Sequence, residues 1–245
     1  MKVVICGEFP EKAEENIFHS FPLSWEVHIV PPSGLASELS NADILIPEHV
    51  EINADLLSKA PKLKLVQTGA GYDNVDLKAC TEFGVQACNA AGVNAYAVAE
   101  HVMALILSWY KNIPYLDHFL KDRGEADQLD YTGAELYGKT IGIIGLGHVG
   151  RIVAEYCNAF HMTVLGYSHK LIEMCSVEQV DLDTLFRDSD IISLHVPLTD
   201  STRHLINAET FSKMKPDALL INTSRGGTVD EAALITALEN KDISG

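Results

Sequence analysis

The sequence carries a glycine pattern, GxGxxG, whose spacing is typical of phosphate binding. Its members are Gly145, Gly147 and Gly150, which lie between an apolar run and a segment with helical periodicity. In that context the glycines allow a tight turn, a close approach to a pyrophosphate and close packing of helix on strand. The amides of His148 and Val149 would point at the phosphate, with the His148 side chain an exposed bystander. We predict a dinucleotide-binding turn; the alternative is a glycine-rich turn without a ligand.

An arginine near the end of the chain is the second candidate for chemistry. Arg225 lies in "INTSRGG" (221–227), directly after an apolar run. The carboxyl ends of parallel strands meet at one edge of a sheet, so Arg225 would lie at the same edge as the glycine turn. A guanidinium fixed there can hold a carboxylate through two hydrogen bonds and polarise a carbonyl. This position favours substrate binding over the alternative, an ion pair with one of the 34 acidic residues.

Short runs rich in Val, Ile and Leu recur along the chain and alternate with helix-like segments. Near-continuous apolar strands of this kind predict parallel sheets covered on both faces. The predicted fold class is α/β, with two doubly wound parallel-sheet domains at 1–94 and 95–245. A helix over 95–120, interrupted at Pro114, opens the second domain, a polar link follows over 121–139, and no short repeat stands out. The predicted strands cover 2–7, 25–30, 42–47, 63–69, 85–89, 140–145, 163–168, 191–196 and 219–224.

Composition excludes several classes of protein. The chain has 245 residues, 47% of them hydrophobic and 21% charged, which is typical of a globular protein. A net charge of −16 without a basic patch argues against nucleic acid. The N-terminus lacks a secretory h-region, and the apolar stretch 102–110 is too short to span a membrane. The five cysteines have no metal-like spacing. We predict a cytoplasmic protein without a metal, and the wide apolar face of helix 95–113 predicts a homodimer.

Five motifs, in order and at suitable spacing, resemble the D-isomer-specific 2-hydroxyacid dehydrogenase family. The resemblance implies a flavodoxin-like substrate domain and a Rossmann NAD(P)-binding domain, with a chain that returns to the first domain at its C-terminal end. It also implies an oxidoreductase that transfers a hydride between a nicotinamide cofactor and a small 2-keto or D-2-hydroxy acid such as glyoxylate, hydroxypyruvate or pyruvate. The motifs are "TGAGYDNVD" (68–76), "NAAGVNAYAVAEHV" (89–102), "GKTIGIIGLGHVG" (138–150), "ISLHVPLTDSTRHLI" (192–206) and "INTSRGGTVDEAAL" (221–234).

The resemblance assigns roles to individual residues. It implies that the amides of Ala70 and Gly71 hold the substrate carboxylate, and the glycines around Ala70 suit a backbone nest for an anion. The plain alternative is a turn in which Asp73 and Asn74 cap the next helix. The resemblance also implies that Arg225 binds the keto acid. The residues expected beside the cofactor, besides the glycine turn, are Ser168, His169, Lys170, His195, Val196, Pro197, Thr202, Thr223 and Ser224.

The same reaction needs a proton donor. A histidine beside a carboxylate suits the task, because the carboxylate raises the imidazole pKa. In the family a glutamate and then a histidine follow the arginine, but the last histidine here is His204. The later acids are predicted to belong to a helix, and His195 is interpreted as a packing or orienting group. We expect that the catalytic pair lies outside these residues, that the C-terminal part of a longer enzyme is absent, and that residues 1–245 reduce no keto acid. These later acids include Asp230, Glu231 and Glu239.

The choice between the two nicotinamide cofactors depends on "VLGYSHK" (164–170). In NAD-binding domains an acidic residue about twenty positions beyond the glycines binds the ribose hydroxyls. Here Ser168 ends the strand, and His169 and Lys170 follow, so nothing at this position repels a 2′-phosphate; Glu173 is the nearest opposing charge. We predict NADP over NAD. The rival function is a dinucleotide-sensing binding protein or corepressor, because one fold hosts several functions.

Overall fold

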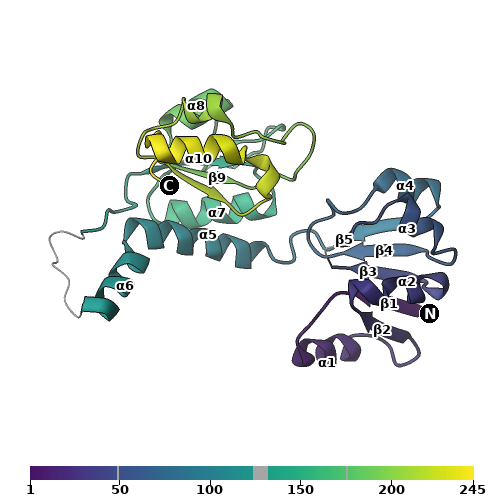
Figure 1. Cartoon of the computed structure of the whole chain (residues 1–245). Coiled ribbons are helices and arrows are strands. Elements are labelled where there is room, and N and C mark those ends of the chain that lie inside the picture. Colours follow the sequence, from purple (N-terminus) through teal and green to yellow (C-terminus); the bar gives the residue numbers. More distant parts are fainter. Residues whose placement is uncertain (49, 124–131, 175) are drawn as a thin grey trace. The chain divides into compact units, whose positions relative to one another are not determined.

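The computed structural model describes residues 1–48, 50–123, 132–174 and 176–245 (Figure 1). Part of the predicted link 121–139, and Cys175, lie outside the described residues. Contacts divide the chain into two compact units, which we call unit 1 (Met1–Val93) and unit 2 (Asn94–Gly245). Each unit is built on a parallel sheet of five strands, which confirms the predicted α/β class.

Unit 1 has the strand order β2-β1-β3-β4-β5, with every neighbouring pair parallel. All five of its strands coincide with predicted apolar runs, to within two residues at each end. Its elements are β1 (Lys2–Cys6), α1 (Glu11–His19), β2 (Glu26–Val30), η1 (Pro32–Gly34), α2 (Leu35–Glu38), η2 (Leu39–Asn41), β3 (Ile44–Pro47), α3 (Ala54–Ser58), β4 (Leu65–Thr68), α4 (Leu77–Glu82) and β5 (Gln86–Asn89).

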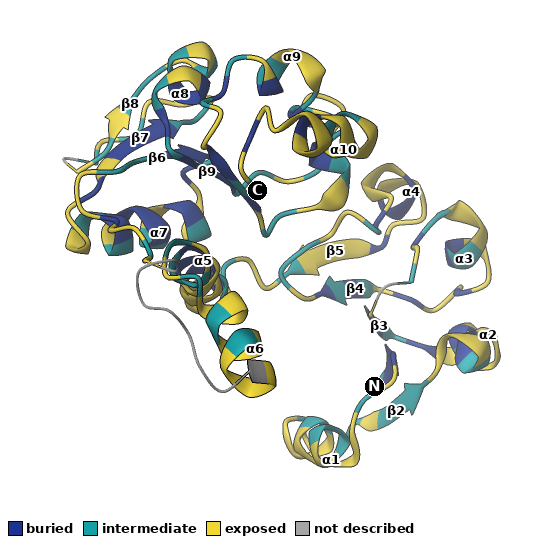
Figure 2. Ribbon diagram, turned by 60° about the vertical axis from the view of Figure 1, so that its left-hand side comes forward, coloured by how far each residue is buried: buried dark blue, intermediate teal, exposed yellow. Residues whose placement is uncertain are grey.

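The core of unit 1 lies on one face of its sheet. Alternate strand residues such as Val4, Leu45 and Val66 are fully buried there against side chains from α2, α3 and α4. On the opposite face Val3 and Ile5 of β1 are buried, but the apolar residues of β3 and β4, such as Ile44 and Leu65, are only half-buried, and α1 contributes no buried residue. Figure 2 shows a difference between the units: β5 of unit 1 is almost wholly exposed, whereas the central strands of unit 2 are buried.

Unit 2 has the strand order β10-β9-β6-β7-β8, the doubly wound Rossmann arrangement. Because the order reverses beside β6, the carboxyl ends of β6 and β9 form the point at which such sheets bind ligands. Its elements are α5 (Ala95–Tyr110), α6 (Ile113–Arg123), β6 (Thr140–Ile144), α7 (His148–Ala159), β7 (Thr163–Tyr167), β8 (Glu178–Gln179), α8 (Leu182–Asp188), β9 (Ile191–Leu194), α9 (Ala208–Phe211), β10 (Leu219–Asn222), η3 (Gly226–Thr228) and α10 (Glu231–Asn240).

Both faces of the unit 2 sheet are covered. One face packs against α5 and α7, with Ile143 and Val153 fully buried between them. The other packs against α8, α9 and α10, with Phe186 and Ile192 at its centre. Burial on both faces explains why these strands are continuous apolar runs in the sequence.

The long helix is interrupted before the proline that predicted its interruption. α5 ends at Tyr110, and Asn112 takes a left-handed φ of 53° before α6 begins at Ile113. Pro114 then lies in the first turn of α6, where its missing N–H costs nothing. The break therefore comes from the Asn112 conformation, which asparagine adopts more readily than most residues.

An internal repeat links the two units, although none was evident in the sequence. Residues 52–79 and 206–233 align without gaps, and each segment contains a parallel bridge, Ile52 with Val75 and Ile206 with Val229. The identities are spread too thinly to stand out before the structure aligns them. The identical positions are Ile52/Ile206, Asn53/Asn207, Ala54/Ala208, Ser58/Ser212, Lys59/Lys213, Leu65/Leu219, Val75/Val229, Asp76/Asp230 and Ala79/Ala233.

The last two residues of the chain pair with backbone at the start of the edge strand β10. The Leu220 amide donates to the Gly245 carbonyl at 2.8 Å, and the Ser244 amide donates to the Ala218 carbonyl at 2.9 Å. These bonds satisfy backbone groups at the start of the edge strand. In the part of the chain that the structure describes, no helix is long and apolar enough to cross a membrane.

Candidate functional site

The glycine turn joins β6 to α7, as predicted. Gly145 has a φ of 102°, and a Cβ there would lie 2.5 Å from the His195 carbonyl oxygen, so only glycine fits. A Cβ on Gly150 would overlap the Gly145 carbonyl oxygen. Gly147 differs, because a Cβ there would meet nothing within 4 Å. Two glycines therefore pack the turn against the protein, and the third leaves its outer side open.

The start of α7 offers hydrogen-bond donors on that open side. The helix begins at His148 with Gly147 as its N-cap, and no side chain caps it. The first amides of a helix lack partners within the helix, and the helix dipole favours an anion beside them. The exposed His148 side chain leaves them uncapped. This open, uncapped turn fits the pyrophosphate of a dinucleotide.

The segment 195–202, which follows β9, is held in place by hydrogen bonds to other parts of unit 2 and within itself. The His195 amide donates to the Ile144 carbonyl at 2.8 Å, and the His195 ring Nε2 lies 2.9 Å from the hydroxyl of the fully buried Ser193. Burial lowers the pKa of His195 to about 4, so the ring is neutral near pH 7. Thr202 is buried, and its hydroxyl donates to the Pro197 carbonyl at 2.6 Å. Ser193, His195 and Thr202 therefore fix the backbone at the switch point.

The loop after β10 is organised by Asn222. Its side-chain oxygen accepts from the Ser224 amide at 3.0 Å, and its Nδ2 donates to the Arg225 carbonyl at 3.0 Å. The Thr228 hydroxyl donates to the same carbonyl at 2.7 Å. The backbone of Arg225 is thus fixed on both sides, while its side chain is exposed and Nη1 donates to the Ser224 carbonyl at 2.9 Å. Thr223 Oγ1 is buried and has no partner among the described residues.

The corresponding loop of unit 1 follows β4. The Gly69 carbonyl accepts from the Ala90 amide at 2.9 Å, and the Ala70 carbonyl accepts from Asn89 Nδ2 at 2.8 Å. In a trans peptide the N–H points away from the preceding C=O. The amides of Ala70 and Gly71 therefore point away from β5, and within the described residues neither donates a hydrogen bond.

The helix after this loop is capped by a residue that the sequence reading did not name. Asp76 accepts from the Ala79 amide at 2.9 Å and is the N-cap of α4. Asn74 has a different partner, because its Nδ2 donates to the Val50 carbonyl at 2.7 Å. The capping interpretation of Asp73 and Asn74 is thus wrong: both precede the cap position.

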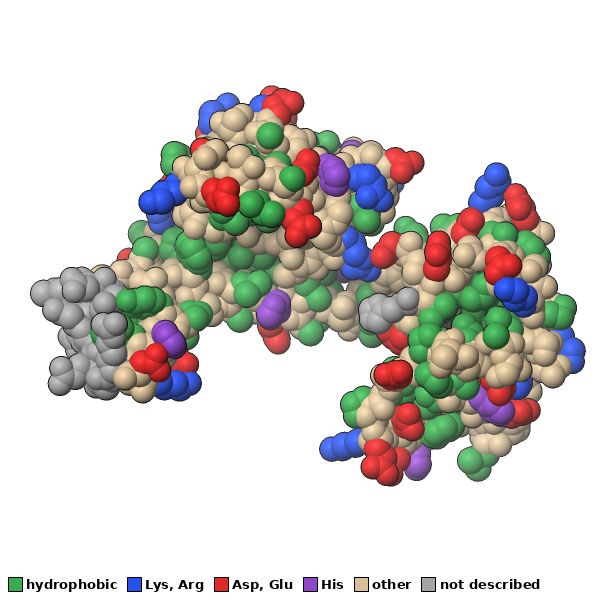
Figure 3. Space-filling view, viewed as in Figure 1, with side chains coloured by type: hydrophobic (Ala, Val, Ile, Leu, Met, Phe, Trp, Pro, Cys, Tyr) green, Lys and Arg blue, Asp and Glu red, His purple; other side chains and the backbone are tan. Residues whose placement is uncertain are grey.

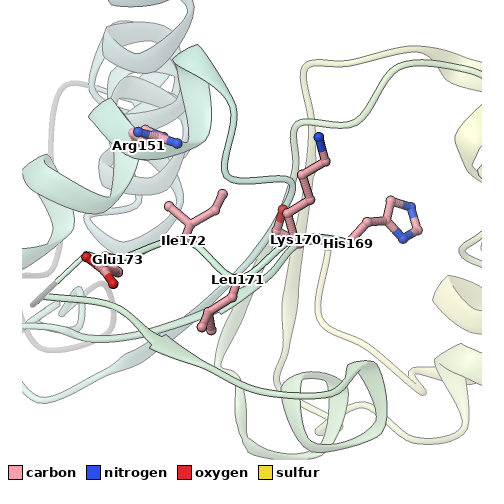
Figure 4. Close-up of a pocket in the computed structure, with 7 residues that line it drawn as sticks. Arg151, His169, Lys170, Leu171, Ile172 and Glu173 are labelled. Atoms are coloured by element: carbon pink, nitrogen blue, oxygen red, sulfur yellow. The ribbon is translucent and has the colours of Figure 1, made fainter.

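An open pocket of about 550 Å³ lies beyond the carboxyl end of β7 (Figure 4). Arg151 of α7 lines it together with residues 168–173, which include Ser168, Lys170 and Glu173. Arg151 Nε donates to the Leu146 carbonyl at 3.0 Å, which ties this side chain to the glycine turn. In Figure 4 the His169 ring points away from the other labelled side chains. The pocket therefore brings a cation from each of two elements to the predicted ribose-binding position.

The acidic residues that were predicted to belong to a helix lie in α10 or cap it, and the last histidine lies in a loop. Asp230 is the N-cap of α10, Glu231 begins that helix, and Glu239 lies near its end, all as predicted. His204 is exposed, with a left-handed φ of 51°, and its amide donates to the Gly227 carbonyl at 2.9 Å.

Fold and turn together define a dinucleotide-binding α/β protein. Comparison with known proteins makes the class specific. The chain belongs to the family described as D-isomer specific 2-hydroxyacid dehydrogenase, NAD binding domain, whose model matches residues 103–245. This confirms the family predicted from the motifs, and NAD(P)-type binding is a property that the family description names.

The similarity to named relatives covers more of the chain than the family model does. It is 41% identical over 216 residues to a D-3-phosphoglycerate dehydrogenase of Methanocaldococcus jannaschii, covering 85% of this chain and 41% of that protein. It is 38% identical over 260 residues to a glyoxylate reductase of Thermococcus litoralis, covering 100% of this chain and 78% of that protein. The chain thus spans less than half the length of the first relative.

A solved structure shares the whole fold. An acyclic imino acid reductase in complex with NADPH and D-Arg matches all of this chain and 81% of its own, with a TM-score of 0.89 and 33% identity. The relatives named here are dehydrogenases and reductases, which does not favour the corepressor alternative.

Sequence reasoning missed the side chains that hold the two loops. Asn89, Asn74 and Asn222 each bond to backbone at a loop. Asn89 is 19 residues from Ala70, so no local pattern reports the bond. An available signal was the position of Asn89 at the last residue of a predicted strand, whereas Asn222 lies two residues before the end of the predicted strand 219–224.

Proposed function

We propose that the protein containing this chain transfers a hydride between a nicotinamide cofactor and a small 2-keto or D-2-hydroxy acid. The observation that carries the proposal is the pair of matched loops. One offers two amides, at Ala70 and Gly71, that donate no hydrogen bond within the described residues, and the other presents Arg225 in the unit that holds the dinucleotide turn. Relatives named for glyoxylate and hydroxypyruvate support a substrate of this size. A panel of glyoxylate, hydroxypyruvate and pyruvate tests it by steady-state kinetics.

Each group of residues has a defined task in this proposal. The amides of Ala70 and Gly71 bind the substrate carboxylate, and Arg225 binds the keto acid and polarises its carbonyl. When bound, the nicotinamide supplies or accepts the hydride. The fixed backbone of the glycine turn and of the switch point orients it. The residues proposed to hold the cofactor are Gly145, Gly147, His148, Val149, Gly150, Ser168, His169, Lys170, His195, Val196, Pro197, Thr202, Thr223 and Ser224.

The decisive variant is Arg225→Gln in the intact enzyme. We expect kcat/KM for the keto acid to fall about a hundredfold or more, because a charge-assisted contact to the substrate is lost. The Kd for the cofactor should stay within about twofold. Arg187→Gln on α8 is the matched control, since that exposed arginine pairs with its neighbour Asp188. Normal turnover of Arg225→Gln would refute the assignment.

We further propose that the cofactor is NADP rather than NAD. Lys170 and Arg151 bring two cations to the pocket after β7, against one carboxylate from Glu173. The Ser168 hydroxyl can donate to a phosphate oxygen. Ser168→Asp should raise the KM for NADPH and shift preference towards NADH, because a carboxylate repels the 2′-phosphate. A wild-type kcat/KM tenfold higher with NADH would contradict the proposal.

We also propose that unit 2 mediates a homodimer. Exposed apolar side chains continue from α5 onto α6, and such a surface is typical of an interface. Paired substitutions Leu105→Glu and Ile113→Glu should produce a monomer in sedimentation experiments, whereas the exposed Leu23→Glu in unit 1 should not. A dimer that survives both substitutions would exclude this surface. The surface comprises Tyr96, Leu105, Trp109, Ile113, Tyr115 and Leu120.

A further inference from the structure

The last residue of β5 binds the loop whose Ala70 and Gly71 amides donate no hydrogen bond within the described residues. Asn89 is half-buried, and its Nδ2 donates to the Ala70 carbonyl at 2.8 Å. The next residue, Ala90, donates its amide to the Gly69 carbonyl at 2.9 Å. One residue further back, the Gln67 side chain donates to the Thr68 carbonyl at 2.8 Å. Three successive carbonyls of this loop are therefore bound by donors of the protein.

Binding these carbonyls determines what the loop offers to a ligand. Each carbonyl shares a planar peptide unit with the next amide, so fixing the carbonyls of Gly69 and Ala70 fixes the amides of Ala70 and Gly71. Among the described residues, a Cβ on Gly69 would meet no atom within 4 Å, so the loop is not packed at that position. The amides of Ala70 and Gly71 are thus pre-oriented away from β5, without any positive charge in the loop.

Of the two bonds that fix the site, only one depends on a side chain. The Ala90 amide is backbone and tolerates most substitutions, whereas the bond to Ala70 exists only while position 89 carries a side-chain donor. Without it the Ala70–Gly71 peptide unit can rotate and direct its carbonyl, a negative dipole, at a bound anion. Preorganised donors bind developing or full negative charge better than donors that must first reorient.

We propose that Asn89 is a positioning residue for carboxylate binding: it holds the Ala70–Gly71 peptide so that the Gly71 amide faces the substrate beside the Ala70 amide. This inference rests on the proposed role of those amides in binding the substrate. It assigns Asn89 no contact with the substrate itself. The expected signature is a loss of carboxylate affinity that leaves cofactor binding intact.

The test is a titration of the ¹⁵N-labelled chain, saturated with NADPH, with oxalate as the carboxylate probe. In the wild type the Ala70 and Gly71 amide signals should shift as oxalate binds. Asn89→Ala and the isosteric Asn89→Asp should weaken the oxalate Kd at least tenfold, while the NADPH Kd stays within about twofold. Asn89→Asp keeps the shape of the side chain and so covers a failure of Asn89→Ala to fold.

A stability-matched control separates positioning from general loss of structure. Asn53 is also in unit 1, and its side chain accepts from the Leu56 amide at 3.1 Å as the N-cap of α3. Asn53→Ala should lower Tm by an amount similar to Asn89→Ala without changing the oxalate Kd. If the wild-type amides ignore oxalate, the proposed substrate site fails; if they respond and both Asn89 variants bind oxalate normally, the positioning role is overturned.

Discussion

The two units carry the same loop at the same place and equip it differently. The six residues 69–74 follow β4 and the six residues 223–228 follow β10, and each loop leads into a bridge and a capped helix. In unit 1 the Ala70 amide makes no bond among the described residues, whereas the Ser224 amide at the matching position donates to Asn222. One loop therefore offers backbone and the other presents a side chain, Arg225. The framework is reused, and the chemistry is set by the loop.

The similarity extends to the amino ends of the strands in both sheets. The amide of the first strand residue donates to an aspartate, Lys2 to Asp43 at 2.9 Å and Thr140 to Asp190 at 2.8 Å. A lysine then contacts each aspartate, Lys64 in unit 1 and Lys215 in unit 2. Both aspartates come directly before a strand, β3 and β9 respectively, so they tie neighbouring strands together. This shared arrangement lets differences between the units be tested with matched substitutions.

The sharpest difference concerns the turn after the first strand. Gly7 follows β1 as Gly145 follows β6, and both amides bond to the carbonyl at the end of the neighbouring strand. Gly145→Ala should lower NADPH affinity a hundredfold or more and destabilise unit 2 by about 3 kcal/mol, because backbone blocks the new Cβ and φ is positive. Fluorescence titration and urea unfolding measure the two effects.

Gly7→Ala is the matched variant in unit 1. A Cβ there would meet the Phe9 ring at 2.9 Å, a side chain that can move aside. We expect a cost of about 1 kcal/mol and no change in cofactor affinity. Equal damage from the two substitutions would show that the glycine turn is not special to unit 2.

Acid should weaken unit 2 selectively, through His195. The matching residue of unit 1 is the exposed Glu48, whose amide bonds to Cys6 as that of His195 bonds to Ile144. Folded His195 stays neutral down to about pH 4, while the unfolded chain takes up a proton near pH 6.5, so stability is lost as pH falls between these values. From pH 7 to pH 5 the loss is about 2 kcal/mol.

His195→Asn should remove this part of the acid sensitivity. Urea unfolding of wild type and variant at pH 7 and pH 5 gives the difference, which cancels the titration of all other groups. An unchanged pH dependence in the variant would mean that His195 titrates as an exposed histidine does.

The smallest predicted effect tests whether the two matching helix caps contribute equally to stability. Asp76 caps α4 and Asp230 caps α10, each by accepting hydrogen bonds from first-turn amides. Asp76→Ala and Asp230→Ala should each cost about 1 kcal/mol. Hydrogen exchange at the capped helices compares them within their own units. A loss of stability in only one of the two helices would show that the two caps contribute unequally despite their matching geometry.

The predictable features of this protein are those encoded locally. Nine strands and the glycine turn follow from apolar runs and spacing, because buried parallel strands need nearly continuous apolar residues. β8 was not predicted, since Glu178 and Gln179 are polar and become a strand only by pairing with β7. The loop-holding role of Asn89 depends on a partner 19 residues away, and the repeat on alignment of two folds. Such features arise from tertiary contacts that no window of sequence contains.

Charge shows the same division between what composition gives and what placement adds. The net charge of −16 was read from the sequence, and on the face in Figure 3 acidic side chains are spread over both units with lysines and arginines dispersed among them. Composition therefore predicted the excess of acid. The grouping of Arg151 and Lys170 at one pocket emerged only from the fold.

The paired bridges give the two loops a similar frame but different neighbours. Both loops have six residues between a strand end and a bridge, yet β4 lies between β3 and β5, whereas β10 pairs with β9 alone in the described sheet. What loop 69–74 offers to a ligand therefore depends on its own residues and also on Asn89 and Ala90, which bond to it from the end of β5. An exchange of the two loops would have to carry this neighbouring strand end along with the six residues.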